Sequence, residues 1–404
     1  MASEQLEIPA RIELPAWHKT LCFGLMGVGV VGAIVGAVTD FTAFQTGYLA
    51  GFWFTFSLAL LGAFYLAVGY ATSAGWNVTL RRIPEAMTRW LPYAAVLGLG
   101  AVAFLFVPHG VFEHWLHPHG AHAAVIEKKL WWLNVPRFLI TYVVVMALLV
   151  FLVRKMVNHS YAQDEDGDTE HTWRQQGMAG PFLIVFSLGY SALSVDFVMS
   201  LQPTWFSTMW GVYMFAGHWQ AACALVCLVA VWLIETDRIS TTWLNENHIH
   251  DAAKFTFAFT VFYAYIAFSQ FLLIWYANLP EEATFFVYRA KDGWLAHSLW
   301  IPAAKFIIPF AILLRHGIKR LGKGLKFICM WIITFQAYEM WWIVAPAAKH
   351  GSAHPGPGIP FVEWTMILGF FGAFLFVAGK ALAANNIIPI KDPRLHECMH
   401  HHQV

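Results

Sequence analysis

Charged residues are scarce in this sequence. Asp, Glu, Lys and Arg make up only 12% of its 404 residues, and the formal net charge at pH 7 is +1. Soluble globular domains carry about 25% charged residues, so a composition this poor in charge argues against one. The near-neutral balance also gives no reason to expect nucleic acid as a partner, because nucleic acid selects strongly basic surfaces.

Cysteine is also rare and follows no known cofactor pattern. The five cysteines are Cys22, Cys223, Cys227, Cys329 and Cys398. They form no C-x-x-C pair, no haem-attachment motif and no iron–sulfur run. Histidines gather in the segment 109–122 without an ordered set of carboxylates, and we interpret that segment as a contact for a periplasmic partner. We therefore expect no metal site, no covalently bound cofactor and no catalytic redox centre in this chain.

Apolar residues, by contrast, are abundant. They make up 58% of the chain, which also contains 20 Trp and 13 Tyr, residues that favour membrane interfaces. A helix needs about 20 residues to cross a bilayer, and only helices satisfy their own backbone there. The apolar stretches of that length are 20–39, 48–72, 91–112, 134–153, 180–202, 207–234, 255–278, 295–314, 326–346 and 361–383. The prediction is an all-α integral membrane protein with ten transmembrane helices.

The distribution of Lys and Arg sets the expected orientation. Ten spans place both termini on one side, and most cations of the connecting segments lie on that side. Because cytoplasmic loops are enriched in Lys and Arg, both termini should be cytoplasmic. The chain then divides into a cytoplasmic N-terminus (1–19), a ten-helix membrane domain (20–383) and a cytoplasmic tail (384–404). One cytoplasmic connection, 158–177, is expected to be an acidic, solvated loop.

An internal repeat places charged residues inside two pairs of apolar helices. Residues 132–140 (WLNVPRFLI) match residues 300–308 (WIPAAKFII), so Arg137 and Lys305 are equivalent. In the next apolar helix of each half, an acid precedes a proline by seven residues: Asp196 before Pro203, and Glu339 before Pro346. A repeat of this kind predicts two similar structural units.

The repeat predicts the grouping of the helices. We expect two tandem four-helix bundles, formed by helices 2–5 (48–202) and helices 6–9 (207–346), with helices 1 and 10 flanking them. Four spans separate equivalent helices, so the two units have the same orientation. They are therefore parallel repeats, unlike the inverted repeats of many transporters.

The four repeated charges are the first candidates for function. A charge at the bilayer centre costs about 2.5–3.5 kcal/mol on insertion scales, so such groups face a bundle interior or a partner. Arg137 with Asp196, and Lys305 with Glu339, are candidates for a proton path; the alternative is that both are structural ion pairs. Lys changes its protonation state when buried more readily than Arg, which favours the second pair as the proton path.

Two flanking prolines further support Lys305 as part of a proton path. It lies between Pro302 and Pro309, and proline removes a backbone donor and bends a helix. We expect a bend there that leaves free carbonyls and room for water near the ammonium group. Gln336 lies one turn before Glu339 and should face the same way.

Three further polar residues could extend a proton path. His218 is at mid-depth in its helix and could titrate or bind a quinone oxygen; the alternative is a packing histidine, since its repeat equivalent is Phe52. Tyr213 and Gln270 are polar groups in apolar helices, and each could instead be an interhelical hydrogen bond. If the chain binds quinone, His218 and Asp196 are the candidate ligands.

Two long motifs and the tail carry a resemblance to a known family. They are residues 196–208 (DFVMSLQPTWFST), residues 269–282 (SQFLLIWYANLPEE) and residues 387–394 (IIPIKDPR). With the span count, they resemble the ActF-type membrane subunits of bacterial alternative complex III, which belong to the NrfD/PsrC-like membrane proteins. The resemblance covers essentially the whole chain.

The resemblance implies a place in a quinol:cytochrome c oxidoreductase of the bacterial inner membrane. The implied partners are a sister NrfD-like subunit, a periplasmic iron–sulfur subunit, c-type cytochrome subunits and lipids. Haem and iron–sulfur clusters would belong to those partners, and quinone is the ligand to consider for this chain. The expected role is support of proton movement and assembly beside the quinol-oxidising subunit.

Two other functions remain as alternatives. In one, this chain itself binds and oxidises quinol. In the other, it is a free-standing transporter. The parallel repeat disfavours this, and so does the expected orientation, which places all four repeated charges toward the outer leaflet.

Overall fold

The computed structural model describes residues 11–108, 110–118, 123–320, 322–350 and 355–400. These residues form helices and connections, with no strand among them. The long helices are α1 (Ala16–Thr39), α2 (Phe41–Ala71), α4 (Leu91–Ala103), α7 (Val135–Asp166), α8 (Glu170–Phe197), α9 (Trp210–Glu235), α10 (Glu246–Ala277), α14 (Lys323–Ala348) and α15 (Phe361–Ala384). The shorter helices are α3 (Arg82–Thr88), α5 (Glu113–Leu116), α6 (Ala123–Glu127), α11 (Pro280–Tyr288), α12 (Leu295–Pro302), α13 (Ile308–Leu313) and α16 (Leu395–Met399).

Ten helical segments in the described part of the chain are long and apolar enough to cross a membrane. Seven of them are single long helices. The third combines α3 and α4, the fifth continues α8 to Leu201, and the eighth combines α12 and α13. Each of the ten apolar stretches expected from the sequence overlaps one of these segments.

The expected loop 158–177 is wrong. Helix α7 continues to Asp166 and α8 begins at Glu170, so the connection is only three residues long. Gly167 adopts a left-handed conformation, with φ of 77°, which ends α7 and reverses the chain. Ser160 and Asp164 on the extension of α7 bond to Arg82 of α3, which holds this polar end of the helix in place.

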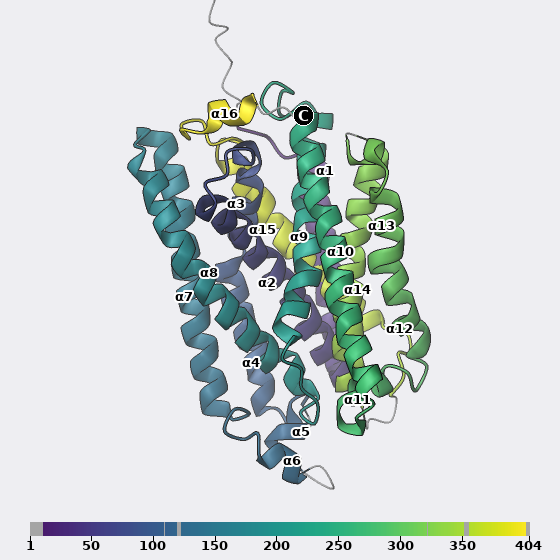
Figure 1. The fold of residues 1–404 in the computed structure, drawn as a ribbon. Coiled ribbons are helices and arrows are strands. Elements are labelled where there is room, and N and C mark those ends of the chain that lie inside the picture. Colours follow the sequence, from purple (N-terminus) through teal and green to yellow (C-terminus); the bar gives the residue numbers. More distant parts are fainter. Residues whose placement is uncertain (1–10, 109, 119–122, 321, 351–354, 401–404) are drawn as a thin grey trace, which may run out of the picture.

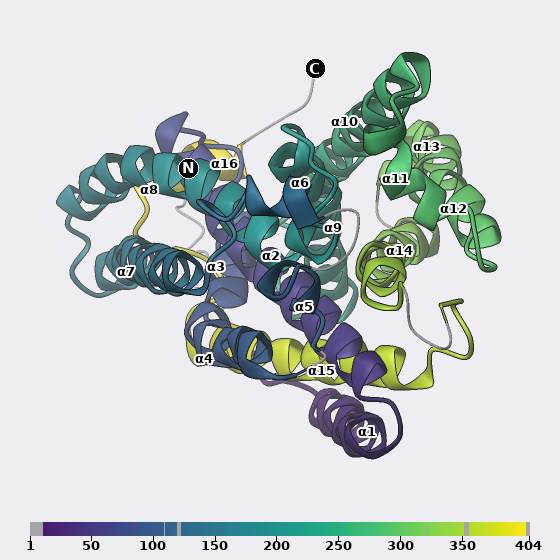
Figure 2. The same cartoon turned by 90° about the horizontal axis from the view of Figure 1, so that it is seen from below.

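Helices α2 and α9 form the centre of the molecule and are buried along most of their length. Helix α2 packs against α3, α4, α8, α9, α14 and α15. Helix α9 packs against α10 and α14, and it also contacts α2 and α8. Figure 2 shows α7 and α8 on one side of this centre and α10 to α13 on the other.

The first and tenth spans lie together on one flank. Helix α1 packs along α15, and α15 packs on α2 and α3. Figure 1 shows α16 at one end of the stack of helices, and α5, α6 and α11 at the opposite end. Residues 1–10 and 401–404, which belong to the termini expected to be cytoplasmic, lie outside the described residues, as do His109, His119 and His122 of the histidine-rich segment.

The contact between α1 and α15 depends on small residues. A side-chain carbon added to Gly29 would lie 2.5 Å from the Cα of Gly369, which is much too close for any real contact. Close approach through glycine is how helices associate where both partners are apolar and no hydrophobic gain is available.

We expect Gly29→Val to separate α1 from α15 and lower stability by about 1–3 kcal/mol, the usual effect of overpacking. The matched control is Gly27→Val on the same helix, where an added carbon meets nothing within 4 Å. Thermal unfolding of the full chain in detergent would measure both. Equal unfolding temperatures for the two variants would contradict the contact.

Candidate functional site

The first repeated charge pair is a bidentate salt bridge at the start of α7. Asn134 caps this helix by accepting a hydrogen bond from the Arg137 backbone N–H at 2.9 Å. The Arg137 guanidinium donates to both carboxylate oxygens of Asp196 on α8, at 3.1 and 2.5 Å. Trp132 donates its indole N–H to Asp196 at 3.1 Å, and its ring lies 4.2 Å from the guanidinium carbon. Both carboxylate oxygens of Asp196 therefore have partners.

The second pair lies deeper and is bonded differently. The Lys305 Nζ lies 3.5 Å from the Glu339 Oε2, and Lys305 also donates to the Gln336 side-chain oxygen. Tyr213 on α9 and Tyr263 on α10 both donate their hydroxyl groups to the Glu339 Oε1 at 2.5 Å. The side chains of Lys305 and Glu339 are 0% and 1% exposed, whereas that of Arg137 is 20% exposed. We refer to Tyr213, Tyr263, Lys305, Gln336 and Glu339 as the Lys305 cluster.

The Lys305 cluster joins all four helical segments of the second half of the repeat. Its members come from α9, α10, the turn between α12 and α13, and α14. Gly217 of α9 lets the helices approach, because an added side-chain carbon would lie 2.8 Å from the Gln336 oxygen and 3.1 Å from the Glu339 Oε2. The polar groups are therefore enclosed between helices rather than presented to the surroundings.

The backbone around Lys305 is a π-helical turn, Ala303–Ile307. Pro309 has no N–H, so the Lys305 carbonyl loses its normal helical partner four residues ahead. The side chain of Gln220 on α9 donates to that carbonyl at 3.1 Å and to the Thr260 hydroxyl at 2.8 Å. The expected break in the helix is present, and the Gln220 side chain bonds to the freed carbonyl.

The π-helical turn frees a second carbonyl. The backbone N–H of Ile308 bonds to Ala303 five residues back, which leaves the Ala304 carbonyl without its usual donor. Trp331 of α14 donates its indole N–H to this carbonyl at 2.8 Å. Side chains from two neighbouring helices thus hold the strained segment that positions Lys305.

The structure places two sequence candidates outside the Lys305 cluster. His218 is fully buried and bonds through Nδ1 to the Met214 carbonyl of its own helix at 2.8 Å. Its Nε2 has no hydrogen-bond partner among the described residues. Gln270 is buried near the end of α10, and its side-chain oxygen likewise has no partner in the described part of the chain. Gln336 and Tyr213, by contrast, are both in the cluster.

Tyr263 is the functional candidate that the sequence reasoning missed. The available signal was a polar stripe on α10 at helical spacing: Thr256, Thr260, Tyr263 and Gln270. All four are buried, whereas most of the remaining α10 side chains are at least partly exposed. The stripe therefore marks the face of α10 that points toward α9 and the cluster.

A second proline, Pro346, also frees backbone groups near the C-terminal end of α14. It leaves the Trp342 carbonyl without its helical donor. Arg289 donates to the Trp342 and Ile343 carbonyls at 3.3 and 2.5 Å, and its guanidinium carbon lies 3.6 Å from the centre of the Phe285 ring. Burial lowers the pKa of Arg289 to about 9, so it is protonated at neutral pH. We interpret this buried cation as structural.

The first half has a related contact. Lys129, in the connection before α7, donates to the Pro203 carbonyl at 2.7 Å. Burial lowers the pKa of Lys129 from its ordinary value. A loop cation therefore bonds the backbone near the proline in each half, and neither contact was expected from the sequence.

A buried charged network was also missed at the end of the molecule that carries α16. Arg82 bonds to Glu85 at 2.5 Å and to Asp164, and Glu85 accepts from the Ser160 hydroxyl at 2.6 Å. These groups pair with one another at the junction of α3 and α7, which is the arrangement of a structural brace.

Chemically, the Lys305 cluster is a short chain of ionisable groups in contact. An ammonium, a carboxylate and two phenols can exchange protons along hydrogen bonds, whereas a bidentate Arg–Asp pair is fixed in its charged form.

Among the described residues, no group of three or more His, Cys, Asp and Glu could hold a metal ion. No protein-family model matches the sequence, and no curated protein matches it. The site is therefore interpreted from its own residues.

The two charge pairs should respond differently to substitution. Removing one partner of a buried pair costs about 3–5 kcal/mol, whereas removing both is often close to neutral. We expect Lys305→Met and Glu339→Gln each to destabilise the protein strongly, and the double variant to recover much of that loss. Thermal unfolding of the full chain in detergent measures this cycle.

The matched cycle uses Arg137→Met and Asp196→Asn. Because the Arg137 side chain is 20% exposed, solvent can accommodate it when Asp196 is neutralised. Its single variants should therefore destabilise less than those of the second pair. Additive effects of Lys305→Met and Glu339→Gln would show that the two groups do not interact.

Proposed function

We propose that this chain is a multi-pass membrane subunit of a quinol:cytochrome c oxidoreductase of the alternative complex III type. In this proposal it supports proton movement and assembly beside a quinol-oxidising sister subunit. The observation that carries the proton role is the Lys305 cluster, in which Tyr213 and Tyr263 converge on Glu339. The place in the complex rests on the resemblance of residues 196–208, 269–282 and 387–394.

The proposal includes a membrane arrangement. The chain crosses the bacterial inner membrane ten times with both termini in the cytoplasm, as its Lys and Arg residues favour. Helices α2, α3–α4, α7 and α8 form one four-helix bundle, and α9, α10, α12–α13 and α14 form the other. The contacts within each set and the matching positions of the two charge pairs support this division.

The two bundles have different roles in the proposal. Arg137 and Asp196 form a fixed pair, because the guanidinium engages both carboxylate oxygens and stays charged. Lys305 and Glu339 form the protonatable pair, because a lysine ammonium can lose its proton inside a protein and phenols can pass protons on. In this proposal the first copy of the repeated motif has a structural role and the second copy carries protons.

The partners follow from the proposed complex. Electrons would pass to a periplasmic iron–sulfur subunit and c-type cytochrome subunits, since no redox-centre motif was found in this sequence. The sister NrfD-like subunit would oxidise the quinol. Apolar side chains on α10, such as Leu273, Trp275 and Tyr276, are more than half exposed and suit contact with lipid or with these partners.

A second candidate function has one specific observation in its favour. The buried Nε2 of His218 can accept a hydrogen bond and has no partner among the described residues, as a quinol hydroxyl would require. In this alternative the chain itself binds and oxidises quinol. Asp196 is a weaker quinone ligand, because Arg137 and Trp132 already occupy its oxygens.

Glu339→Gln tests the proton role in the complex purified from its native membranes. The amide keeps the size of the side chain but cannot ionise. We expect quinol turnover to be retained while the protons moved per electron fall to less than about half, because the cluster loses its carboxylate. Stopped-flow measurement with a pH-sensitive dye and a quinol oxidation assay give both quantities.

The matched control is Glu363→Gln. Glu363 is also a buried carboxylate paired with a lysine, at 2.7 Å from Lys349, but it lies at the junction of α14 and α15. This variant should keep both activities. If Glu339→Gln left the proton yield unchanged, the proton role would be wrong.

His218→Phe separates the two candidate functions, because phenylalanine is the repeat equivalent at position 52. Under the accessory role we expect quinol turnover within about twofold of wild type, since no reacting group is lost. A loss of turnover and of quinone binding, with an intact sister subunit, would favour quinol oxidation by this chain. Isolation of the tagged chain without any haem-containing partner would contradict membership of the complex.

A further inference from the structure

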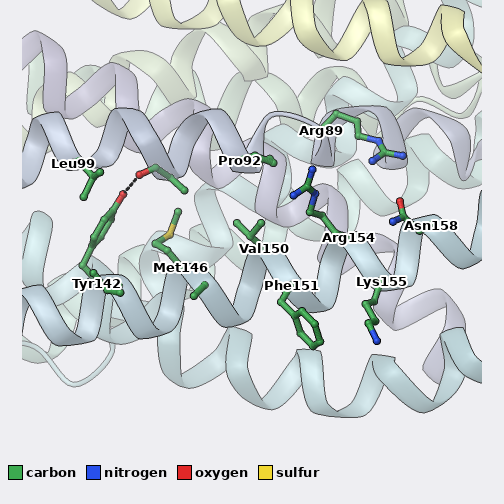
Figure 3. Close-up of a pocket in the computed structure, with 13 residues that line it drawn as sticks. Arg89, Pro92, Leu99, Tyr142, Met146, Val150, Phe151, Arg154, Lys155 and Asn158 are labelled. Carbon is green, nitrogen blue, oxygen red and sulfur yellow. Dashed lines mark hydrogen bonds between the residues drawn. The ribbon is translucent and has the colours of Figure 1, made fainter.

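A lateral groove of about 760 Å³ runs between α4 and α7. Its walls are mostly apolar along its length, with Leu99 from α4 and Met146 and Val150 from α7 (Figure 3). Tyr142 bridges the two helices by donating its hydroxyl to the Ala95 carbonyl at 2.5 Å. At the opposite end of the groove the lining changes to cationic and polar residues.

The cationic end is formed by Arg89 and Arg154. Arg89 directly follows α3 and Arg154 lies on α7, and Figure 3 shows both side chains in the part of the groove away from Leu99 and Tyr142. No Asp or Glu lines the groove. The Arg89 guanidinium carbon lies 4.9 Å from the centre of the Tyr161 ring, and Arg154 is exposed without an ion-pair partner in the described part of the chain. Two cations that face one space without an acid leave an anion-binding position between them.

A second groove, of about 480 Å³, meets the first at these arginines. It runs between α4, α7 and α15 and is also lined by Arg89 and Arg154, together with Lys380 of α15. Its remaining lining is largely apolar and again contains no Asp or Glu. The two grooves therefore share a cationic centre: the first extends from it along α7 to Tyr142, and the second surrounds Arg154 and Lys380 between α7 and α15.

The depth of the cationic centre matches a lipid headgroup. From Arg137 to Arg154 helix α7 rises about 25 Å at about 1.5 Å per residue, which approaches the roughly 30 Å thickness of the hydrocarbon layer. If Arg137 lies at the outer edge of that layer, Arg154 lies near the inner edge. Tyr93, which is 55% exposed beside the second groove, suits an interfacial position.

We propose that this site binds one anionic glycerophospholipid of the cytoplasmic leaflet. Arg89 and Arg154 hold its phosphate, and its two acyl chains lie along the two grooves. Basic positions between helices on the cytoplasmic side are where anionic headgroups bind. A neutral quinone could accept hydrogen bonds from the arginines but brings no negative charge to compensate them, and a single-chain ligand would fill only one groove. The assignment does not depend on the proton role of the Lys305 cluster.

The test uses the full-length chain in detergent, titrated with phosphatidylglycerol or with phosphatidylcholine carrying the same acyl chains. Native mass spectrometry counts the bound lipids. We expect one phosphatidylglycerol to bind at least about tenfold more tightly than phosphatidylcholine. Arg154→Gln should lower the preference for phosphatidylglycerol over phosphatidylcholine about fivefold. Arg89→Gln/Arg154→Gln should abolish nearly all of this preference.

The matched control is Arg315→Gln/Lys323→Gln, two exposed cations near the same end of the molecule that line neither groove. It should bind phosphatidylglycerol as wild type does. Because the Arg154 side chain is exposed, Arg154→Gln should fold normally, and its unfolding temperature without lipid should equal that of wild type.

Four results would overturn the proposal. Equal affinity for phosphatidylglycerol and phosphatidylcholine would show that the site does not select an anionic headgroup. An equal loss of this preference in the control variant would show that overall charge, not this site, causes the effect. The same stabilisation by millimolar inorganic phosphate without lipid would assign the arginines to a free anion. Protection of Arg154 by a partner polypeptide in the native complex, with no lipid retained, would also contradict it.

Discussion

The burial of an ammonium and a carboxylate between α9, α10, α12–α13 and α14 is the constraint on which the second half of this molecule depends. Neither charge can be left alone in an apolar interior, so each must be surrounded by groups that stabilise it. Glu339 receives two phenolic hydroxyl groups and the ammonium, and Lys305 receives Gln336 and Glu339. These partners come from four separate helical segments, so the same contacts that satisfy the charges also fix how the helices pack. Gly217 is part of this solution, because only a residue without a side chain allows α9 to approach the carboxylate.

Proline creates a second kind of constraint in the same helices. Pro309 and Pro346 each release a carbonyl that needs a donor in an apolar surrounding, and in both places the structure supplies a side chain. Gln220 serves the carbonyl released by Pro309, and Arg289 serves the one released by Pro346. Polar residues in apolar helices thus divide into two groups with different meaning. Some hold broken backbone in place, and others, such as Tyr213, meet an ionisable side chain.

The two halves of the repeat place the same motif in different surroundings. Arg137 lies in the first turn of α7, where Asn134 caps the helix and the guanidinium reaches Asp196 from the edge of the bundle. Lys305 lies further along its span, because α12 adds two turns before it, and its side chain is entirely enclosed. The difference in depth follows from where each helix begins. It makes the first pair a rigid link and gives the second the surroundings that a proton-handling group needs.

The amino-acid pattern by itself determined the helical class, the ten spans and the pairing of each cation with the acid of the following span, because periodic apolar runs and charges in them leave few alternatives. It also identified Gln336 and Tyr213. Tertiary structure decided the rest. Whether Tyr263 or Gln270 faces the charges, and whether His218 joins them, depends on helix rotation and crossing, which no single helix encodes. Part of the segment expected as a loop at 158–177 is helical, because Ser160 and Asp164 bond to Arg82, which is distant in the chain. The local sequence shows which polar and charged groups need hydrogen-bond or ion-pair partners. Only the packing of all the helices decides which residues those partners are.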